Sequence, residues 1–469
     1  MKKIDIAIGI ASISLTVLFS GCGATKDYER PADINTDGIY GDAQTEGEES
    51  LGDLKWREIF TDPTLQALIE KVLAQNTDMI NADIQLQEVQ YTLKASKLAF
   101  VPSMYFTPDM GVTKMYDPYN RNSYSSMTSG NSKTYELPVT FGWQSVNFAQ
   151  LRNQKKGVEV TKKQMENAKQ AVQASLVANV ANMYYNLAMF DEQLDMMTQT
   201  EENWGKYLDM ERKLMAAGQA NTAAVKSIEA TYYSICTSVT SLKENIRLVE
   251  NSLSTLMGET AHGIERQGLA SFQAPSILST GVPITLLSRR PDVKESELTL
   301  AGAFYDTKAA RAAFWPSLTI TAAGEYTNSV GTSIINPGMM IGNAIASLTQ
   351  PIFANGKLRA QYKISKLDME IASNNFQQTV IAAGNEVNTA MVQLNTAEQL
   401  RDLYGKQVDA LKVALDATQK LYVNSSGNYL NVITAQNSLI SAEMDFISNR
   451  MDAISATISL YEALGGGTD

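Results

Sequence analysis

Two stretches of the chain, 148–214 and 356–422, each run for 67 residues without proline and with little glycine. Proline interrupts the hydrogen bonds of a helix and glycine weakens a helix, so both stretches favour unbroken helix. At 1.5 Å of rise per residue, each helix would span about 100 Å. The chain is therefore predicted to be elongated and mainly α-helical.

A segment of small and polar residues follows each long stretch, at 217–221 and at 424–428. A second helix is predicted after each of these breaks, over 221–257 and over 429–464. Each long helix thus becomes one arm of a helical hairpin, and the two breaks become the tips of the hairpins.

The returning helices carry a coiled-coil pattern. Apolar residues from Ile228 to Leu256 recur at alternating spacings of four and three, and the residues from Ile433 to Tyr461 follow the same spacing. The final helix carries a second apolar stripe, from Ala435 to Leu460. Two stripes predict a helix with neighbours on both sides, as in a curved wall of helices.

The sequence also repeats itself. The segment ASKLAFVPSM at 95–104 is similar to AARAAFWPSL at 309–318, which lies 214 positions later. An internal duplication of this size predicts two similar structural units in one chain. We place the first structural repeat at 51–287 and the second at 288–469.

Each repeat is expected to contain a shorter helix followed by a strand hairpin. The helices are predicted over 79–101 and 291–315, and the hairpins over 103–143 and 317–350. Apolar and polar residues alternate in these hairpins, as in Tyr135 to Trp143, although 340–350 alternates less clearly. Strands of about ten residues have the length that a tilted outer-membrane strand needs. A half-buried soluble sheet has the same period, so the pattern leaves both interpretations open.

A signal peptide is predicted at residues 1–21. Two lysines precede an uncharged stretch of 16 residues, which is long enough for a signal-peptide core and short for a membrane span. The sequence LFSGC, which ends at Cys22, is similar to a bacterial lipoprotein cleavage box. Cys22 is therefore expected to carry acyl chains, and 22–50 to form a polar tether. An ordinary signal peptide with an incidental cysteine is the alternative.

No later segment approaches the roughly 18 apolar residues of a membrane-spanning helix. If the mature chain spans a membrane, it must do so with strands that close into a barrel and satisfy every backbone group. Four strands cannot close alone, because the smallest membrane barrels use about eight. Separate chains would then have to share one barrel, and two chains would be the physical minimum.

Composition excludes several classes of function. The net charge of −11 argues against a nucleic-acid partner, which requires a basic face. One histidine, His262, and two cysteines, Cys22 and Cys236, argue against a zinc site and a disulfide framework. The sequence contains no catalytic triad, P-loop or dinucleotide fingerprint, so we expect no enzyme. No cofactor is expected beyond the acyl chains on Cys22.

Two motifs suggest chemistry but have simpler explanations. The 20 methionines could serve copper or silver export, and Met196–Met197 is the best candidate pair, yet packing in an apolar core explains them better. The run SRRPD at 288–292 looks like a phosphate clamp. We prefer to interpret it as the start of a helix with Pro291 in its first turn. The arginines would then form buried or inter-chain ion pairs.

Six motifs in order along the chain resemble those of the outer membrane factors of tripartite efflux systems, the lipoproteins related to TolC, OprM and NodT. The motifs are WREIF with DP at 56–63, SRRPDV at 288–293, AAFWPS at 312–317, QPIF at 350–353, NYL at 428–430 and LGGG at 464–467. The resemblance covers nearly the whole mature chain.

The resemblance implies a mainly α fold with a membrane β part, the TolC-like trimeric α/β barrel. Each chain of the homotrimer would give four strands to a shared outer-membrane barrel and its helices to a periplasmic tunnel. The implied partners are a periplasmic adaptor protein, an inner-membrane transporter of the resistance-nodulation-division (RND) type and outer-membrane lipid. The implied location is the outer membrane of a Gram-negative bacterium.

The implied function is passive export of drugs or other small molecules. Type I secretion and heavy-metal efflux are alternatives for the same kind of channel. A non-channel, structural coiled-coil lipoprotein is the alternative from a different class, and it would be soluble without detergent.

The hairpin tips, 215–222 and 423–429, are the predicted gate, because a tunnel that is open at both ends would make the outer membrane leak. Charged residues within a few turns of the tips could form gating salt bridges, and small residues in the turns could let them open. A solvated charged face is the alternative. Relatives often carry an aspartate where this chain has Gly427. The candidates are Asp209, Glu211, Arg212, Lys213, Gly218, Asp416, Lys420, Ser425 and Gly427.

Overall fold

A computed structural model describes the chain at residues 27–31, 39, 50–114, 131–273, 275, 289–327, 339–423 and 429–468. The chain divides into two compact units, and neither coincides with a sequence repeat. The first unit combines Glu88–Lys162 with Leu298–Ser373, and the second combines Lys163–Glu297 with Asn374–Asp469 and residues 31–87. Each unit therefore takes segments from both halves of the sequence.

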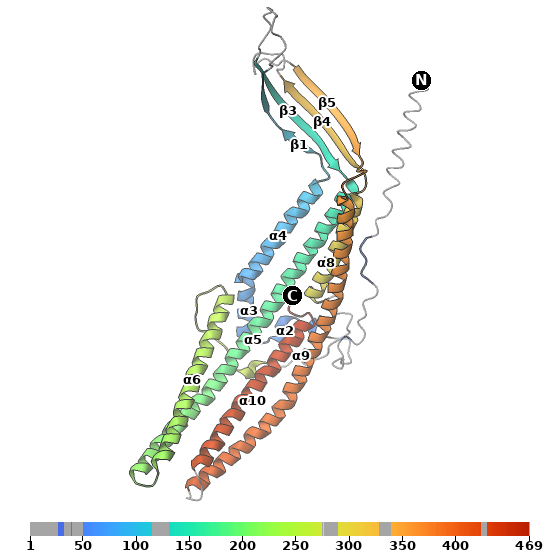
Figure 1. Cartoon of the computed structure of the whole chain (residues 1–469). Helices are drawn as coiled ribbons and strands as arrows, with labels where there is room; N and C mark the ends of the chain where they lie inside the picture. The colour runs from blue at the N-terminus through green and yellow to red at the C-terminus, as the bar shows by residue number, and fades with distance from the viewer. Residues whose placement is uncertain are drawn as a thin grey trace, which may run out of the picture. The chain divides into compact units, whose positions relative to one another are not determined.

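The described part of the first unit holds an antiparallel sheet of five strands (Figure 1). The strands are β1 (Ser103–Phe106), β2 (Asp109–Lys114), β3 (Asn131–Val146), β4 (Ser317–Thr327) and β5 (Met339–Thr349). Their order is β1-β3-β4-β5, and β2 pairs with β3 further along the same edge as β1. Pro108 separates β1 from β2, and proline cannot donate to a ladder, so the two form one interrupted edge strand.

The register of the sheet separates apolar from polar side chains. Met104, Phe141, Ala322 and Ala344 are partners across the strands, whereas Tyr105, Thr140, Ala323 and Asn343 form the next row. The large side chains of the apolar face are exposed, with 64% of Met104 and 50% of Phe141 accessible. The predicted alternation is confirmed in β1, β3 and β4, whereas in β5 the exposed Ile345 lies in the row of Thr321, off the apolar face. The exposed apolar face does not resemble the half-buried sheet of a soluble domain.

Four helices contribute to the first unit: α4 (Thr77–Leu98), α5 (Phe148–Ala216), α8 (Pro291–Ala312) and α9 (Lys357–Val423). The sheet joins them through buried Asn147, whose side-chain amide donates to the carbonyl oxygens of Ala312 at 2.7 Å and Trp315 at 3.3 Å. The described start of the tether also packs here. Asp27 forms an ion pair with Lys156, and Tyr28 lies edge-on to Phe304.

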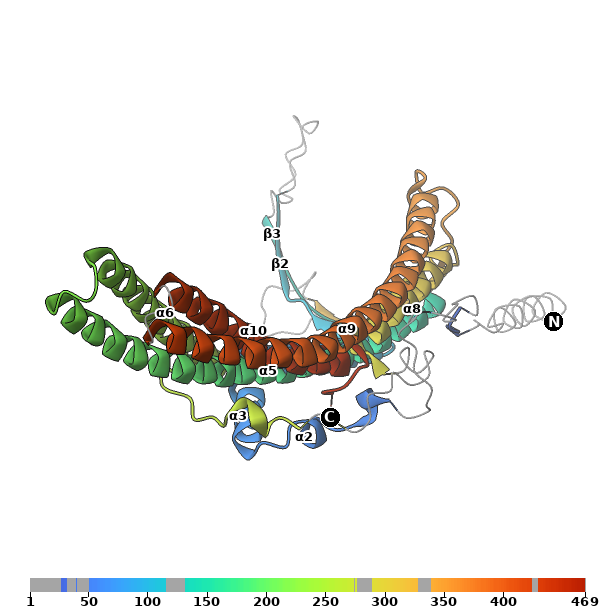
Figure 2. The same cartoon turned by 90° about the horizontal axis from the view of Figure 1, so that it is seen from below.

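The second unit contains two helical hairpins, α5–α6 and α9–α10, in which α6 spans Thr222–Leu256 and α10 spans Tyr429–Ala463 (Figures 1 and 2). One hydrophobic cluster joins α5 and α6 to the 4-3 seam of α10, where Ile433, Ile440 and Met444 pack. A second cluster joins α9 to the other stripe of α10, through Leu439, Ala442 and Phe446. The predicted two-sided burial of α10 is therefore confirmed.

Short elements surround the middle of the second unit: η2 (Leu51–Asp53), α2 (Trp56–Ile59), α3 (Pro63–Gln75) and η3 (Leu269–Ser271). Trp56, Phe60 and Leu65 are almost fully buried here. The Tyr461 hydroxyl at the end of α10 donates to the carbonyl oxygen of Leu54 at 2.8 Å. These contacts attach the segment 51–65 to the last helix of the chain.

All six long helices end within three residues of the predicted limits. The largest differences are at the ends of α4 and α8, which stop three residues before 101 and 315. Val101 precedes Pro102 and Trp315 precedes Pro316, and a residue before proline avoids the helical conformation. The limits of the leader, tether and repeats stay predictions.

Among the described residues, no helix combines the length and the apolar character needed to cross a bilayer.

Candidate functional site

The first hairpin tip is a tight turn closed by backbone hydrogen bonds. After α5 ends at Ala216, the amide of Gln219 donates to the carbonyl oxygen of Leu214 at 2.9 Å. Gly218 takes a positive φ of 74°, a conformation that favours glycine. Asn221 then caps α6 by accepting from the amide of Ala224 at 2.8 Å. The turn is therefore determined by Gly218 and Asn221.

The second hairpin tip follows Val423, the last residue of α9, and α10 begins at Tyr429. Ser425 and Gly427 lie outside the described residues, and so does Cys22.

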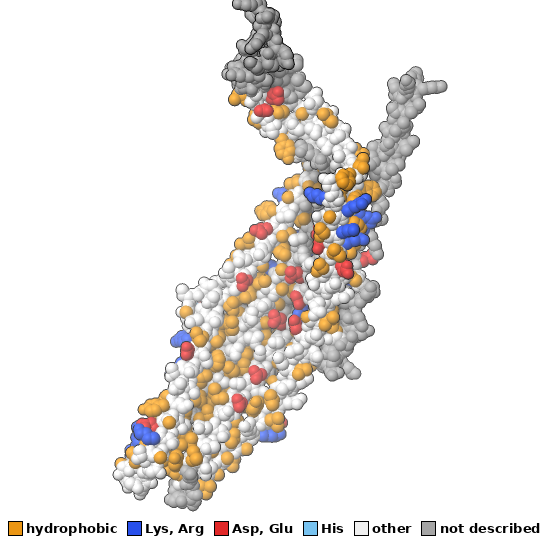
Figure 3. Space-filling view, viewed as in Figure 1, with side chains coloured by type: hydrophobic (Ala, Val, Ile, Leu, Met, Phe, Trp, Pro, Cys, Tyr) orange, Lys and Arg blue, Asp and Glu red, His pale blue; other side chains and the backbone are white. Residues whose placement is uncertain are grey.

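Charged side chains gather at the tip of the α5–α6 hairpin (Figure 3). Arg212 on α5 forms an ion pair with Glu229 on α6 at 2.7 Å, and Lys226 reaches the same carboxylate at 2.5 Å. Hydrogen bonds from Lys226 and Arg212 lower the pKa of the Glu229 carboxyl. Asp209 lies 3.9 Å from Arg212, and Lys213 is exposed. This network ties α5 to α6 within one hairpin.

Asp416 and Lys420 pair with each other at 2.6 Å across one turn of α9, and both are exposed. Such a pair contributes little to stability and does not join α9 to another helix. The predicted charged candidates thus lie at the ends of the hairpins, but each of the ion pairs described here is confined to a single hairpin.

Near the tips, Glu211 of α5 and Tyr422 of α9 form a contact between the two hairpins. Further from the tips, Arg450 of α10 also forms an ion pair with Glu192 of α5. Glu211 is fully buried, and its Oε1 accepts a hydrogen bond from the Tyr422 hydroxyl at 2.7 Å. Glu211 was among the sequence candidates, whereas Tyr422 was not. An aromatic residue in the last turn of a helix is as typical of packing as of hydrogen bonding, so the sequence carried no separate signal for Tyr422.

A second phenol, Tyr207, belongs to the same cluster. Burial and the hydrogen bond to Glu211 together raise the pKa of Tyr422 to about 12. Burial, with Glu211 and Tyr422 close by, also raises the pKa of Tyr207. Both phenols therefore stay protonated near neutral pH. Among the described residues, the Tyr207 hydroxyl and Glu211 Oε2 are buried without a hydrogen-bond partner.

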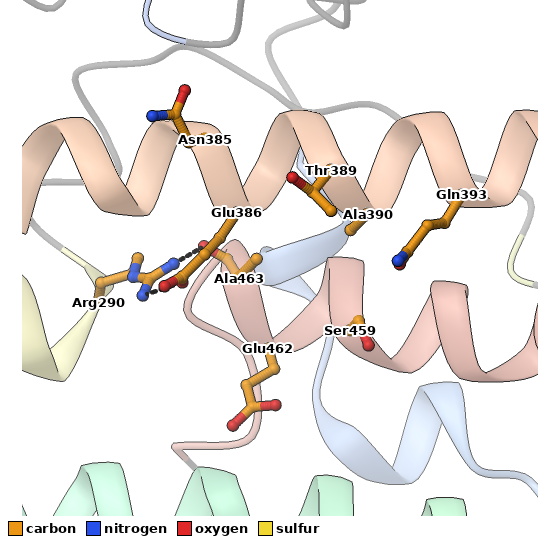
Figure 4. A pocket seen from close by; sticks show the side chains of 9 residues that line it. All are labelled: Arg290, Asn385, Glu386, Thr389, Ala390, Gln393, Ser459, Glu462 and Ala463. Carbon is orange, nitrogen blue, oxygen red and sulfur yellow. Dashed lines mark hydrogen bonds and ion pairs between the residues drawn. The ribbon is translucent and has the colours of Figure 1, made fainter.

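A separate polar concavity lies where α8, α9 and α10 meet, and Figure 4 shows its lining. Arg290, which is 7% exposed, donates to the carboxylate of Glu386 at 2.6 Å and to the carbonyl oxygen of Ala463 at 3.0 Å. It also binds Asp292 in a forked geometry, at 3.0 and 2.7 Å. α8 starts at Pro291, so the described part of the SRRPD motif, 289–292, is a helix start held by a buried arginine, and Ser288 lies outside the described residues.

The methionines, the histidine and the cysteine considered in the sequence lie in packed or exposed positions. Met197 is buried in the cluster between α5, α6 and α10, and Met196 packs beside it. The His262 side chain is 43% exposed, and Cys236 is half-buried with its Sγ 3.2 Å from Glu201. Among the described residues, no group of three or more His, Cys, Asp or Glu could hold a metal ion.

The chain matches the family described as outer membrane efflux protein, over residues 68–259 and again over 282–466. The double match agrees with the internal duplication, and the two stretches cover most of the chain.

Two curated relatives match along almost their whole length. The cation efflux system protein CusC of Escherichia coli K12 is 24% identical over 464 residues, which cover 97% of this chain and 98% of CusC. The probable outer membrane lipoprotein SilC of Salmonella typhimurium is 23% identical over 465 residues, 98% of each chain. The open state of the MtrE outer membrane channel of Neisseria gonorrhoeae has a similar fold, with a TM-score of 0.83, 22% identity and coverage of 96% and 99%.

Two tyrosines of the tip cluster provide a matched pair of substitutions. Tyr422→Phe leaves the buried carboxylate of Glu211 without its donor, so the free energy of unfolding should fall by about 1–3 kcal/mol. Tyr207→Phe removes a hydroxyl that has no partner, so it should change the free energy of unfolding by about 0 kcal/mol or raise it slightly. Urea denaturation of the two variants, followed by far-UV circular dichroism, measures the difference. Equal losses would show that the Tyr422–Glu211 hydrogen bond does not stabilise the tip.

The Arg290–Asp292 pair predicts a pH dependence. Burial raises the pKa of Asp292, but the hydrogen bond and charge of Arg290 outweigh burial, and the net pKa is lowered. A lowered folded-state pKa stabilises the fold above the unfolded-state pKa, and this contribution is lost as the pH falls through the folded-state pKa. Asp292→Asn should therefore reduce stability at neutral pH, by about 1 kcal/mol because the side chain is half exposed. The difference from the unmodified chain should shrink in acid.

Thermal melting at a series of pH values measures this effect. Asp452→Asn is the matched control, because burial raises the pKa of Asp452 and its removal should be neutral or slightly stabilising at neutral pH. A loss for Asp292→Asn that stays constant from neutral to strongly acidic pH would contradict the ion-pair explanation.

Proposed function

This chain belongs to the outer membrane efflux protein family, and we propose that it is the outer-membrane exit duct of a tripartite efflux pump of the RND type. It conducts drugs or other small molecules passively from the periplasm to the exterior. The observation that carries this proposal is the exposed apolar face of the sheet, with large side chains such as Met104, Phe106 and Phe141. Such a face is stable against lipid and would promote aggregation in water.

The open edges of the sheet support a shared assembly. The interrupted edge β1–β2 and the edge strand β5 each pair on one side only within the described chain. In lipid, each unpaired backbone group costs several kcal/mol, so the edges require partners. We propose that three chains supply these partners to one another, as in the homotrimers of the family, and that the hairpins of the second unit form the periplasmic conduit.

The proposed partners are a periplasmic adaptor and an inner-membrane RND transporter. The hairpin tips are the part of the conduit that these partners would contact. Heavy-metal cations are the second candidate substrate class, because CusC is by name part of a cation efflux system. The duct itself would select little, since a wide, wet conduit makes few specific contacts with what passes through it.

Acylation of Cys22 is proposed as the membrane anchor. The LFSGC sequence supports it, and the name of SilC, an outer membrane lipoprotein, is consistent with it. Cys22→Ser should abolish incorporation of labelled palmitate into the protein in cells, because the thiol is the acceptor. Cys236→Ser is the matched control and should be labelled normally, since Cys236 is the half-buried cysteine of α6. Labelling of Cys22→Ser would contradict the proposal.

The gate is proposed to be the tip cluster in which Glu211 binds Tyr422. This hydrogen bond joins the α5–α6 hairpin to the α9–α10 hairpin, so it must break if the hairpins separate. The Arg212–Glu229 pair keeps the first hairpin rigid, and Gly218 permits its turn. The other candidates, Asp209, Lys213, Asp416, Lys420, Ser425 and Gly427, would tune the charge and flexibility around it.

Conductance in planar lipid bilayers tests both the duct and the gate. The purified protein should form a detergent-requiring, SDS-resistant trimer with single-channel conductance. Tyr422→Phe should raise the fraction of time spent in the conducting state, because a contact between the hairpins is lost. Charge reversal at Lys420 should have a smaller effect, since its ion pair with Asp416 lies within α9.

Lys406→Gln is the control, because Lys406 forms an exposed pair with Asp402 on the same helix at 3.5 Å. It should conduct like the unmodified protein. A monomer that is soluble without detergent and carries no current would end the duct proposal and favour a structural coiled-coil lipoprotein. A conducting trimer in which Tyr422→Phe changes nothing would reject the gate alone.

A further inference from the structure

A cavity of about 720 Å³ lies beside the tip cluster, between α5, α9 and α10. α5 contributes Trp204 and Tyr207, α9 contributes Tyr422, and α10 contributes Leu439 and Glu443. Cavities of roughly 300–1,000 Å³ are of the size that holds small organic ligands. The lining is mixed, with an aromatic and aliphatic wall and several polar groups, so the cavity could hold a molecule that is itself amphipathic.

The aromatic wall is rigid. Trp204 is 4% exposed and meets Tyr207 edge to face, with ring centroids 5.8 Å apart and an interplanar angle of 90°. Trp and Tyr rings attract cations, and the attraction grows when the site is shielded from water. This wall therefore favours a positively charged group over a neutral or negative group.

A buried negative charge lies directly behind this wall. Glu211 is held by the Tyr422 hydroxyl at 2.7 Å, and Tyr422 itself lines the cavity. Buried carboxylates normally pair with a cation. Among the described residues, Glu211 has no Lys or Arg partner, and both its Oε2 and the Tyr207 hydroxyl lack a hydrogen bond. The cluster is thus short of one positive charge.

The basic residues near the cavity are already engaged. Lys206 is exposed and pairs with Glu202 at 2.6 Å, one turn along α5. Lys412 pairs with Glu443, which lines the cavity, at 3.2 Å. The lining therefore combines two carboxylates, Glu443 in the wall and Glu211 behind it, with one lysine whose charge is directed elsewhere. Because Lys412 compensates Glu443, an anionic ligand would meet repulsion mainly from Glu211.

We propose that this cavity is a binding site for a small amphipathic organic cation, such as an aromatic ammonium compound. Its ammonium group lies against Trp204 and Tyr207 in the field of Glu211, and its apolar body lies against Leu415, Val432 and Leu439. The lining residues belong to both hairpins, so a bound cation bridges α5 to α9 and α10. On the proposed gate, such a ligand would hold the hairpins together and favour the closed state.

Isothermal titration calorimetry of the full-length protein in non-ionic detergent tests the site directly. The probe is benzyltrimethylammonium, and neopentylbenzene, its neutral isostere, is the comparison. We expect one benzyltrimethylammonium per chain and weaker binding of the neutral compound. Glu211→Gln keeps the shape of the side chain and removes its charge, so it should weaken binding of the cation about tenfold and leave the neutral compound unaffected.

Trp204→Leu removes the aromatic face and should weaken binding of the cation by a similar factor. Trp204→Phe keeps a smaller ring, so its affinity for the cation should lie between those of the unmodified protein and Trp204→Leu. Asp409→Asn is the matched control, because it removes an exposed carboxylate from α9 outside the cavity, and it should bind like the unmodified protein. Gel filtration and circular dichroism check that each variant is folded. If Trp204→Leu does not fold, the result for Glu211→Gln alone tests the proposal.

The proposal is overturned if benzyltrimethylammonium does not bind, if the neutral isostere binds equally well, or if folded Glu211→Gln binds the cation as the unmodified chain does. These readouts are binding constants, so they are independent of whether the protein conducts or how its gate works.

Discussion

Burial of α10 on two sides is the interaction on which the second unit depends. A long helix with one apolar stripe makes a pair and leaves its opposite face in water. α10 instead presents Ile433 and Ile440 to α5 and α6, and Leu439 and Ala442 to α9. The small side chain of Ala442, 1% exposed, allows close approach on the α9 side. Two hairpins that share no covalent link near their tips are thereby packed as one layer, and polar contacts such as Glu211–Tyr422 can form across the junction.

The sheet of the first unit obeys a different constraint, that of register. In a strand, a shift of one residue transfers every side chain to the opposite face. The pairing of Met104 with Phe141, and of Phe141 with Ala322, keeps the apolar set on one side through every strand that joins them. Asn147, at the start of α5, connects this sheet to Ala312 and Trp315 at the end of α8. The sheet and the helices on which it stands are therefore joined by buried hydrogen bonds as well as by the chain.

Much of this fold could be predicted from the sequence, because its signals are local and long. A stretch without proline indicates a long helix, a 4-3 apolar seam indicates a packed helix, and strict alternation indicates a strand. Pro102 and Pro316 explain why the two shorter helices end early. The candidate site could not be predicted to the same depth. Whether Glu211 meets Tyr422 depends on how two hairpins rotate against each other, and Arg290 finds Glu386 nearly a hundred positions away. Charge spacing along one helix indicates intrahelical pairs such as Asp416–Lys420 but says nothing of partners on another helix.

The two edges of the sheet are chemically unlike. β5 offers an unbroken row of backbone groups over Met339–Thr349, whereas the opposite edge is divided at Pro108 into segments of four and six residues. Two identical edges could pair with each other around a two-fold axis and produce a symmetric dimer. Dissimilar edges instead join head to tail, and such contacts close into a ring when the rotation between neighbouring copies completes a full turn. The break at Pro108 thus gives each chain two edges that differ, as head-to-tail pairing requires.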